Sequence, residues 1–96
     1  MKLKVYGWTS YRNECPSAPN GTRQTREIVA AFSWAAAHRA TGKRDSIGQM
    51  RNYGGVTGNA EEVALAVSEP GTVFWCPLHD KYSAKCEWRK ATKVTP

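Results

Sequence analysis

The sequence has no apolar run long enough to form the core of a signal peptide or a helix that crosses a bilayer. Internal repeats, coiled-coil heptads and glycine- and serine-rich linkers are also absent. These absences predict a soluble chain that works in the cytoplasm and has no membrane partner. Only three cysteines are present, and in a reducing compartment we expect them to stay as thiols.

Catalytic signatures are scarce as well. The chain has no HExxH motif and no nucleophile elbow, and the segment 54–58 (GGVTG) lacks the Lys-Ser/Thr pair of a P-loop. Glu61 and Glu62 are adjacent, so on a helix they point about 100° apart and do not form an acid–base pair. A cysteine–histidine couple using His38 or His79 is defined by geometry, which a sequence does not supply. We therefore expect a protein that is not an enzyme and needs no cofactor.

A metal site is the alternative use of the thiols. Cys76 and His79 have the two-residue gap with which a thiolate and an imidazole bind one zinc ion, and Cys15 and Cys86 would complete a tetrahedral set. The second closely spaced pair of a strong zinc signature is missing. Buried or reduced thiols are therefore the favoured interpretation, and no metal ligand is assigned.

The chain carries more positive than negative charge. Fourteen Lys and Arg against eight Asp and Glu give a formal net charge of +6 on 96 residues. Such a field attracts polyanions, among them nucleic acids and acidic protein surfaces, although small proteins also use it for solubility. With 41% hydrophobic and 23% charged residues, the chain is expected to fold as one domain.

Periodicity and turn residues predict a small α+β domain. Polar and apolar side chains alternate over residues 2–7 and predict a first strand, which a long polar loop over 9–24 follows. Residues 25–32 predict a second strand, although their alanines allow a helix almost as well. Residues 73–76 predict a third strand, preceded by a type II turn at 69–72 (EPGT). The prediction is a sheet of about three strands, with two or three short helices packed on one face.

Capping residues indicate the helices. Ser33 precedes an alanine-rich helix over 34–41, and Gly42 follows it. Asp45 or Ser46 caps a second short helix, and Asn59 caps a third. The inner stripe of this third helix is expected to consist of Ala60, Val63, Ala64 and Val67.

The chain becomes polar and basic after Pro77. We therefore expect residues 1–78 to form the compact domain and residues 79–96 to form a basic, partly mobile C-terminal tail. Tyr82 and Trp88 are the side chains that would anchor this tail.

The two helices on either side of Gly42 resemble a helix-turn-helix, a DNA-binding motif. If the second helix entered a major groove, polar side chains there would reach phosphates and base edges. The predicted nucleic-acid-binding residues are Arg39, Lys43, Arg44, Gln49, Arg51 and Asn52. Because His38, Lys43 and Gly48 depart from the usual pattern of the motif, two packed surface helices with a solvated basic rim are the alternative.

Four Trp and four Tyr give this short chain many amphipathic rings. Core packing accounts for some of them, and rings left outside suit stacking or a protein interface. Trp8 and Tyr11 lie beside the predicted long loop and are the expected exposed anchors for a partner protein.

Five segments of the chain carry a family likeness: 5–10 (VYGWTS), 13–16 (NECP), 23–27 (RQTRE), 51–62 (RNYGGVTGNAEE) and 68–75 (SEPGTVFW). In these segments the chain resembles a family of small bacteriophage-encoded accessory proteins of the actinobacteriophage type. The resemblance covers most of residues 1–78 and implies a product made in the host bacterial cytoplasm. It implies binding to a host regulator, a defence component or nucleic acid, and it supplies no active site.

These observations together predict a non-enzymatic binding protein. Nucleic acid is the favoured partner, through the basic helix pair. An inhibitor or modulator of a host bacterial protein, acting through exposed aromatic rings, is the alternative, and a small zinc-binding module is the second alternative.

Overall fold

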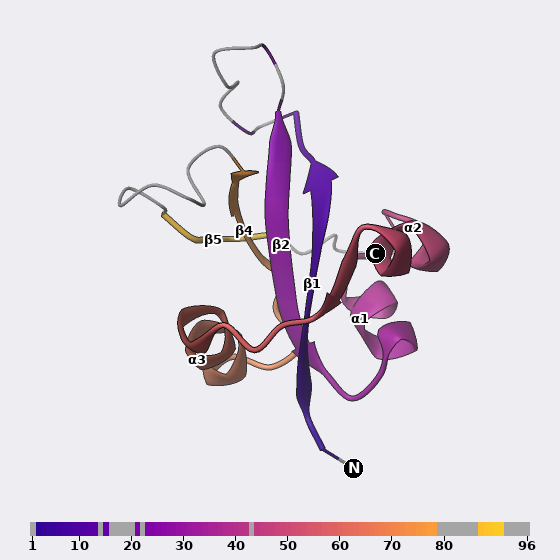
Figure 1. Ribbon diagram of the computed structural model, residues 1–96, viewed down its shortest axis with the longest axis vertical. Helices are drawn as coiled ribbons and strands as arrows, with labels where there is room; N and C mark the ends of the chain where they lie inside the picture. Colours follow the sequence, from indigo (N-terminus) through magenta and orange to yellow (C-terminus); the bar gives the residue numbers. More distant parts are fainter. Residues whose placement is uncertain are drawn as a thin grey trace.

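In the computed structural model, a five-stranded antiparallel sheet carries helices on both of its faces (Figure 1). The structure describes residues 2–13, 15, 21, 23–42, 44–78 and 87–91. Within these residues the elements are β1 (Lys4–Tyr11), β2 (Gln24–Ala31), α1 (Trp34–Ala40), α2 (Ile47–Asn52), β3 (Gly54–Val56), α3 (Ala60–Ser68), β4 (Phe74–Pro77) and β5 (Arg89–Lys90). The strand order is β3-β1-β2-β4-β5, so β2 lies at the centre of the sheet.

β1 and β2 form a long hairpin that is the backbone of the fold. Their register runs from Lys4 opposite Ala31 to Tyr11 opposite Gln24. β1 therefore continues four residues beyond the strand predicted over 2–7, and its last residues come from the predicted loop. The polar residue Ser10 is included because its hydroxyl donates to Asp45 Oδ2 over 2.9 Å, which satisfies it while it is buried.

The two faces of the sheet bury two separate apolar clusters. On one face, Tyr6, Trp8 and Val29 pack with Ala37 of α1 and Met50 of α2. The opposite cluster consists of Val5, Ile28, Ala30, Ala66 and Phe74, and Ala66 belongs to α3. Successive strand side chains point to opposite faces, so each of the central strands contributes to both clusters.

This arrangement corrects part of the predicted architecture. The α+β class is confirmed, but the sheet has five strands where about three were expected. The helices also lie on both faces of the sheet, with α1 and α2 on one and α3 on the other (Figure 1). No helix in the described part of the chain is long and apolar enough to span a bilayer.

The predicted caps of the first two helices are confirmed. Ser33 Oγ accepts a hydrogen bond from the Ala36 amide over 3.1 Å, and Ser46 Oγ accepts one from the Gln49 amide over 3.1 Å. Gly42, which follows α1, has φ of 71°, a left-handed conformation that suits glycine.

The cap of α3 is also confirmed, but its predicted inner stripe is only partly right: Val63 packs against the second apolar cluster, whereas Ala60, Ala64 and Val67 are exposed. Asn59 Oδ1 accepts from the Glu62 amide over 3.0 Å. Val67, predicted as an inner residue, is 45% exposed, whereas Glu62 is only 1% exposed. The helix turns Glu62 inward because Arg26 of β2 binds both carboxylate oxygens over 3.0 Å, and Thr57 donates to one of them over 2.7 Å. An ion pair with a distant residue thus sets the rotation of α3.

The C-terminal part of the described chain completes the sheet. In the predicted turn the Thr72 amide donates to the Glu69 carbonyl over 3.2 Å, and Gly71 has φ of 82°. β4 then runs buried through all of its four residues. From the segment predicted as a tail, β5 pairs with β4, and Trp88 packs against the second apolar cluster. Tyr82 lies outside the described residues.

The close approach of β3 to β1 generates a stability prediction. A Cβ atom at Gly54 would overlap the carbonyl oxygen of Gly7 and the Cβ of Trp8, whereas one at Gly55 would meet nothing within 4 Å. Gly54→Ala should therefore lower the free energy of unfolding by about 1–3 kcal/mol in a urea titration. Gly55→Ala is the control and should change it by less than about 0.5 kcal/mol. Equal effects of the two changes would contradict the close approach.

Candidate functional site

Three cavities adjoin one another beside α1 and α2. Their volumes are about 400, 250 and 480 Å³. Arg12 and Arg44 line both the first and the second, and Tyr11 lines both the second and the third. We call the surface formed by these three neighbouring cavities, which share lining side chains, the arginine–tyrosine groove. The side chains that give it its chemical character are Tyr11, Arg12, Arg23, Gln24, Arg39, Arg44, Gln49 and Tyr53.

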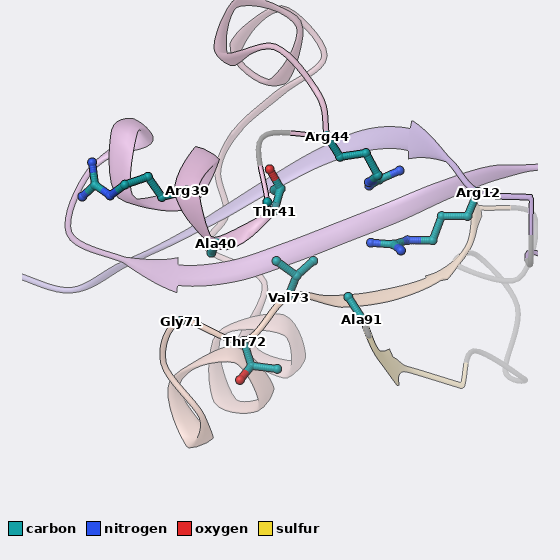
Figure 2. A pocket seen from close by; sticks show the side chains of 10 residues that line it. Arg12, Arg39, Ala40, Thr41, Arg44, Gly71, Thr72, Val73 and Ala91 are labelled. Carbon is teal, nitrogen blue, oxygen red and sulfur yellow. The ribbon is translucent and has the colours of Figure 1, made fainter. Parts of the chain in front are cut away.

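A buried carboxylate lies beneath the first cavity. Glu27, in the middle of β2, has no exposed surface. Arg12 donates to its two oxygens through Nε and Nη2, both over 3.0 Å, and Arg44 Nη2 donates to Oε1 over 2.6 Å. Thr25 Oγ1 adds a fourth hydrogen bond of 2.7 Å. Figure 2 shows the two guanidinium groups pointing toward each other across β2.

The buried carboxylate also orders the connection between α1 and α2. Arg44 belongs to this connection, and its Nη1 donates to the Tyr11 carbonyl over 2.9 Å. The next residue, Asp45, accepts from Trp8 Nε1 over 3.2 Å and from Ser10 over 2.9 Å. The side chains of Arg44 and Asp45 therefore attach this connection to the end of β1.

Two exposed tyrosines line the third cavity. Tyr11 is 64% exposed and Tyr53 is 65% exposed. The Tyr53 carbonyl accepts from the Thr9 amide and its amide donates to the Gln49 carbonyl, both over 3.0 Å. The backbones of both tyrosines are therefore hydrogen-bonded while their rings face solvent.

The groove is cationic. Four arginines line it, at positions 12, 23, 39 and 44, against Asp45 and the buried Glu27. Arg12 also lies 5.5 Å from the centre of the Trp75 ring, which Arg89 approaches to 5.1 Å. The Arg39 side chain is exposed, has no hydrogen-bonding or ionic partner among the described residues, and points away from the Arg12–Arg44 pair in Figure 2. A cationic groove with exposed rings can bind an anionic chain that carries aromatic groups.

The structure brings together part of the predicted nucleic-acid-binding set. Arg39, Arg44 and Gln49 line the groove. Arg51 and Asn52 are exposed on α2 but do not line it. Lys43 lies outside the described residues.

The two residues predicted to anchor a partner protein differ in exposure. Tyr11 is exposed, as expected, but Trp8 is only 1% exposed. The expectation of an exposed Trp8 is therefore wrong. β1 continues past this residue, which places the ring inside the cluster under α1 and α2 and its Nε1 on Asp45.

Sequence reasoning did not single out Arg12, Arg23 and Glu27. The two arginines lie near the two ends of the predicted loop, and the Arg12 amide donates to the Arg23 carbonyl over 3.2 Å. Basic residues at both ends of a hairpin loop are a signal that could have grouped them. Tyr53 is one of the four tyrosines, but nothing in the neighbouring sequence indicates that it lines the same cavity as Tyr11.

The residues considered for zinc are only partly described. Cys15 and Cys76 are buried. His79 and Cys86 lie outside the described residues. Within the part of the chain that the structure describes, no three or more Cys, His, Asp or Glu side chains are grouped as metal ligands would be.

Comparison with protein-family models, curated proteins and solved structures found no match for this chain.

The buried carboxylate gives a second stability prediction. Glu27→Gln keeps the size of the side chain but removes the charge that Arg12 and Arg44 share. Breaking a buried ion pair by neutralising one partner typically costs about 3–5 kcal/mol, and we expect a loss of this size in urea unfolding. Glu87→Gln, at an exposed position, is the matched control and should stay within about 0.5 kcal/mol. If Glu27→Gln lowered the free energy of unfolding by less than about 1 kcal/mol, this would be inconsistent with a buried carboxylate that accepts four hydrogen bonds.

Proposed function

We propose that this protein binds nucleic acid through the arginine–tyrosine groove and catalyses no reaction. The observation that carries the proposal is that four arginines and two exposed tyrosines line three neighbouring cavities that share side chains. Following the resemblance to small bacteriophage proteins, we propose that it acts in the cytoplasm of a bacterial host.

The charge of the groove supports this proposal. The chain carries a net charge of +6, and Arg39 has no ionic partner among the described residues. Cations without such partners can bind phosphates and release the counterions condensed on a nucleic acid. Arg12 and Arg44 also line the groove, but they share the charge of Glu27 and so contribute less to its field.

The predicted helix pair remains part of the proposal in a modified form. α1 and α2 have seven and six residues, and each buries a residue against the sheet, Ala37 and Met50 respectively. Their contribution to the groove is the cationic and amide side chains of Arg39 and Gln49. Insertion of α2 into a major groove is a rival mode of binding to the same class of partner.

A host protein is the alternative partner, and the burial of Trp8 weakens the case for it. With Trp8 inside the core, Tyr11 is the remaining anchor of the two that were predicted. A pull-down from nuclease-treated bacterial lysate separates the alternatives, because a protein partner is retained after the nucleic acid is removed.

Binding through the groove predicts a salt-dependent affinity. Fluorescence anisotropy with a labelled mixed-sequence oligonucleotide should detect binding at low salt that weakens as salt rises. Arg39→Gln should reduce the slope of log affinity against log salt by about 0.7–0.9, the value of one phosphate contact. Arg23→Gln should have a similar effect, because this exposed residue lines the third cavity.

The control is Arg51→Gln, which removes an equal charge from an exposed position on α2 that lines none of the three cavities. This change should leave the slope unchanged if nucleic acid binds in the groove. No binding at low salt, or equal effects of Arg39→Gln and Arg51→Gln, would argue against the groove as the binding surface.

A further inference from the structure

We propose that the nucleic acid bound by the groove is single-stranded and that its bases stack on Tyr11 and Tyr53. This inference rests on the proposed function and adds to it the state of the strand and the site of the bases. It depends on the third cavity, where both tyrosines and three polar side chains meet: Arg23, Gln24 and Gln49.

The two rings have the properties of a stacking platform. Each tyrosine is about two-thirds exposed, at 64% and 65%, although large apolar surfaces are usually buried. Their backbones are held, Tyr11 by Arg44 and Tyr53 by the amide of Thr9. When a flat group settles on either ring, the freedom that is lost is therefore mainly that of the two side-chain torsions of the tyrosine.

The space beside the rings suits a base. The third cavity has a volume of about 480 Å³, within the range of about 300–1,000 Å³ that is usual for small-molecule sites. Gln24 and Gln49 supply amide donors and acceptors for base edges, and Arg23 supplies a cation for a phosphate. Because every base has an aromatic face, a site of this composition tolerates many sequences.

A duplex fits this surface less well than a single strand. In a duplex the faces of the bases are stacked on one another, so Tyr11 and Tyr53 would meet only phosphates and sugars. The helix that would have to enter a major groove, α2, has six residues, or about 9 Å of length. Exposed rings give affinity only to bases that are free to leave the stack.

The other two cavities give the backbone of the strand a path. Tyr11 connects the third cavity to the second, and Arg12 and Arg44 connect the second to the first, which ends beside Arg39. Bases would stack at the end of the groove near Tyr53, where Arg23 would meet a phosphate, and the backbone would continue toward Arg39.

The test compares three probes with the full chain by fluorescence anisotropy at low salt. They are a mixed-sequence 16-nucleotide DNA strand, a length at the upper end of about 4–16 nucleotides per small binding domain, its RNA counterpart, and the DNA strand annealed to its complement. We expect at least one single strand to bind about ten-fold or more tightly than the duplex. The difference between the DNA and RNA strands reports contacts to the sugar.

Substitutions of the rings locate the bases. Tyr11→Ala and Tyr53→Ala should each weaken binding of the single strand by about 5-fold to 150-fold, the loss of one stacked base. Neither change should alter the salt slope, since no charge is removed. Tyr11→Phe and Tyr53→Phe keep the ring and should stay within about 2-fold of the original affinity. Val67→Ala, at a 45% exposed position on the opposite face, is the control for exposed apolar surface.

A spectroscopic readout accompanies the affinities. A 2-aminopurine base in the single strand loses fluorescence when it stacks on an aromatic ring. The loss should occur with the original chain and with the Tyr→Phe variants, and should be smaller with Tyr11→Ala or Tyr53→Ala. Urea unfolding of each variant identifies any that fail to fold, in which case the Phe variants and the 2-aminopurine signal of the original chain still decide the outcome.

The possible failures are distinct. No binding of any probe at low salt would overturn the proposed function and this inference with it. A second outcome is equal affinity for strand and duplex, a lower salt slope with Arg39→Gln, and unchanged affinity with the tyrosine substitutions. This outcome would support the proposed function but overturn the stacking site. A preference for the single strand that survives both Tyr→Ala changes, without a change in 2-aminopurine fluorescence, would also overturn it.

Discussion

The carboxylate of Glu27 connects three parts of this structure: the central strand, the end of β1 and the connection between α1 and α2. It lies fully buried in the central strand and binds Arg12 from the end of β1 and Arg44 from the connection between α1 and α2. Arg44 in turn holds the carbonyl of Tyr11. A buried ion pair contributes little net stability compared with apolar packing, but it penalises arrangements that leave its charges unpaired. Here that penalty positions the hairpin end and the helix connection relative to each other, and the groove lies where they meet.

Arg26, the residue before Glu27, forms a similar ion pair on the opposite face of the sheet. Arg26 points away from Glu27 because strand side chains alternate, and it binds Glu62 of α3. Its guanidinium fills the space that a side chain at Gly7 would need. Arg26 and Glu27 are adjacent in the predicted strand over 25–32, so their side chains point to opposite faces of the sheet. Because each buried charge needs a partner, this pair could have predicted that both faces of the sheet are covered. The helix caps were predictable because their bonds span three residues, whereas the rotation of α3 depends on a residue 36 positions away.

Only those residues of the site that stand out by their charge or by their neighbours in the sequence could be predicted. Arg39 and Arg44 stood out because basic residues cluster between two helices, and Tyr11 because it is a ring beside a polar segment. The exposure of Trp8 was misjudged because the same residue types serve as core and as surface anchors, and only the length of β1 decides between them. Arg12 joins the groove through a register between β1 and β2 that no local pattern specifies.

The cations of the groove therefore divide into two groups. Arg12 and Arg44 form ion pairs with Glu27, so their main effect is to position the end of β1 and the connection between α1 and α2. Within the described residues Arg39 has no ionic partner, and the Arg23 side chain donates to backbone carbonyls, that of Asn13 over 2.6 Å among them, so no carboxylate there offsets either charge. A neutral hydrogen-bond acceptor does not cancel the field of a guanidinium, whereas a carboxylate does. The field felt by an approaching polyanion thus comes from the two ends of the groove, while its middle supplies shape. A flexible anionic strand can follow such a field from end to end, and the rings of Tyr11 and Tyr53 lie where its bases would pass.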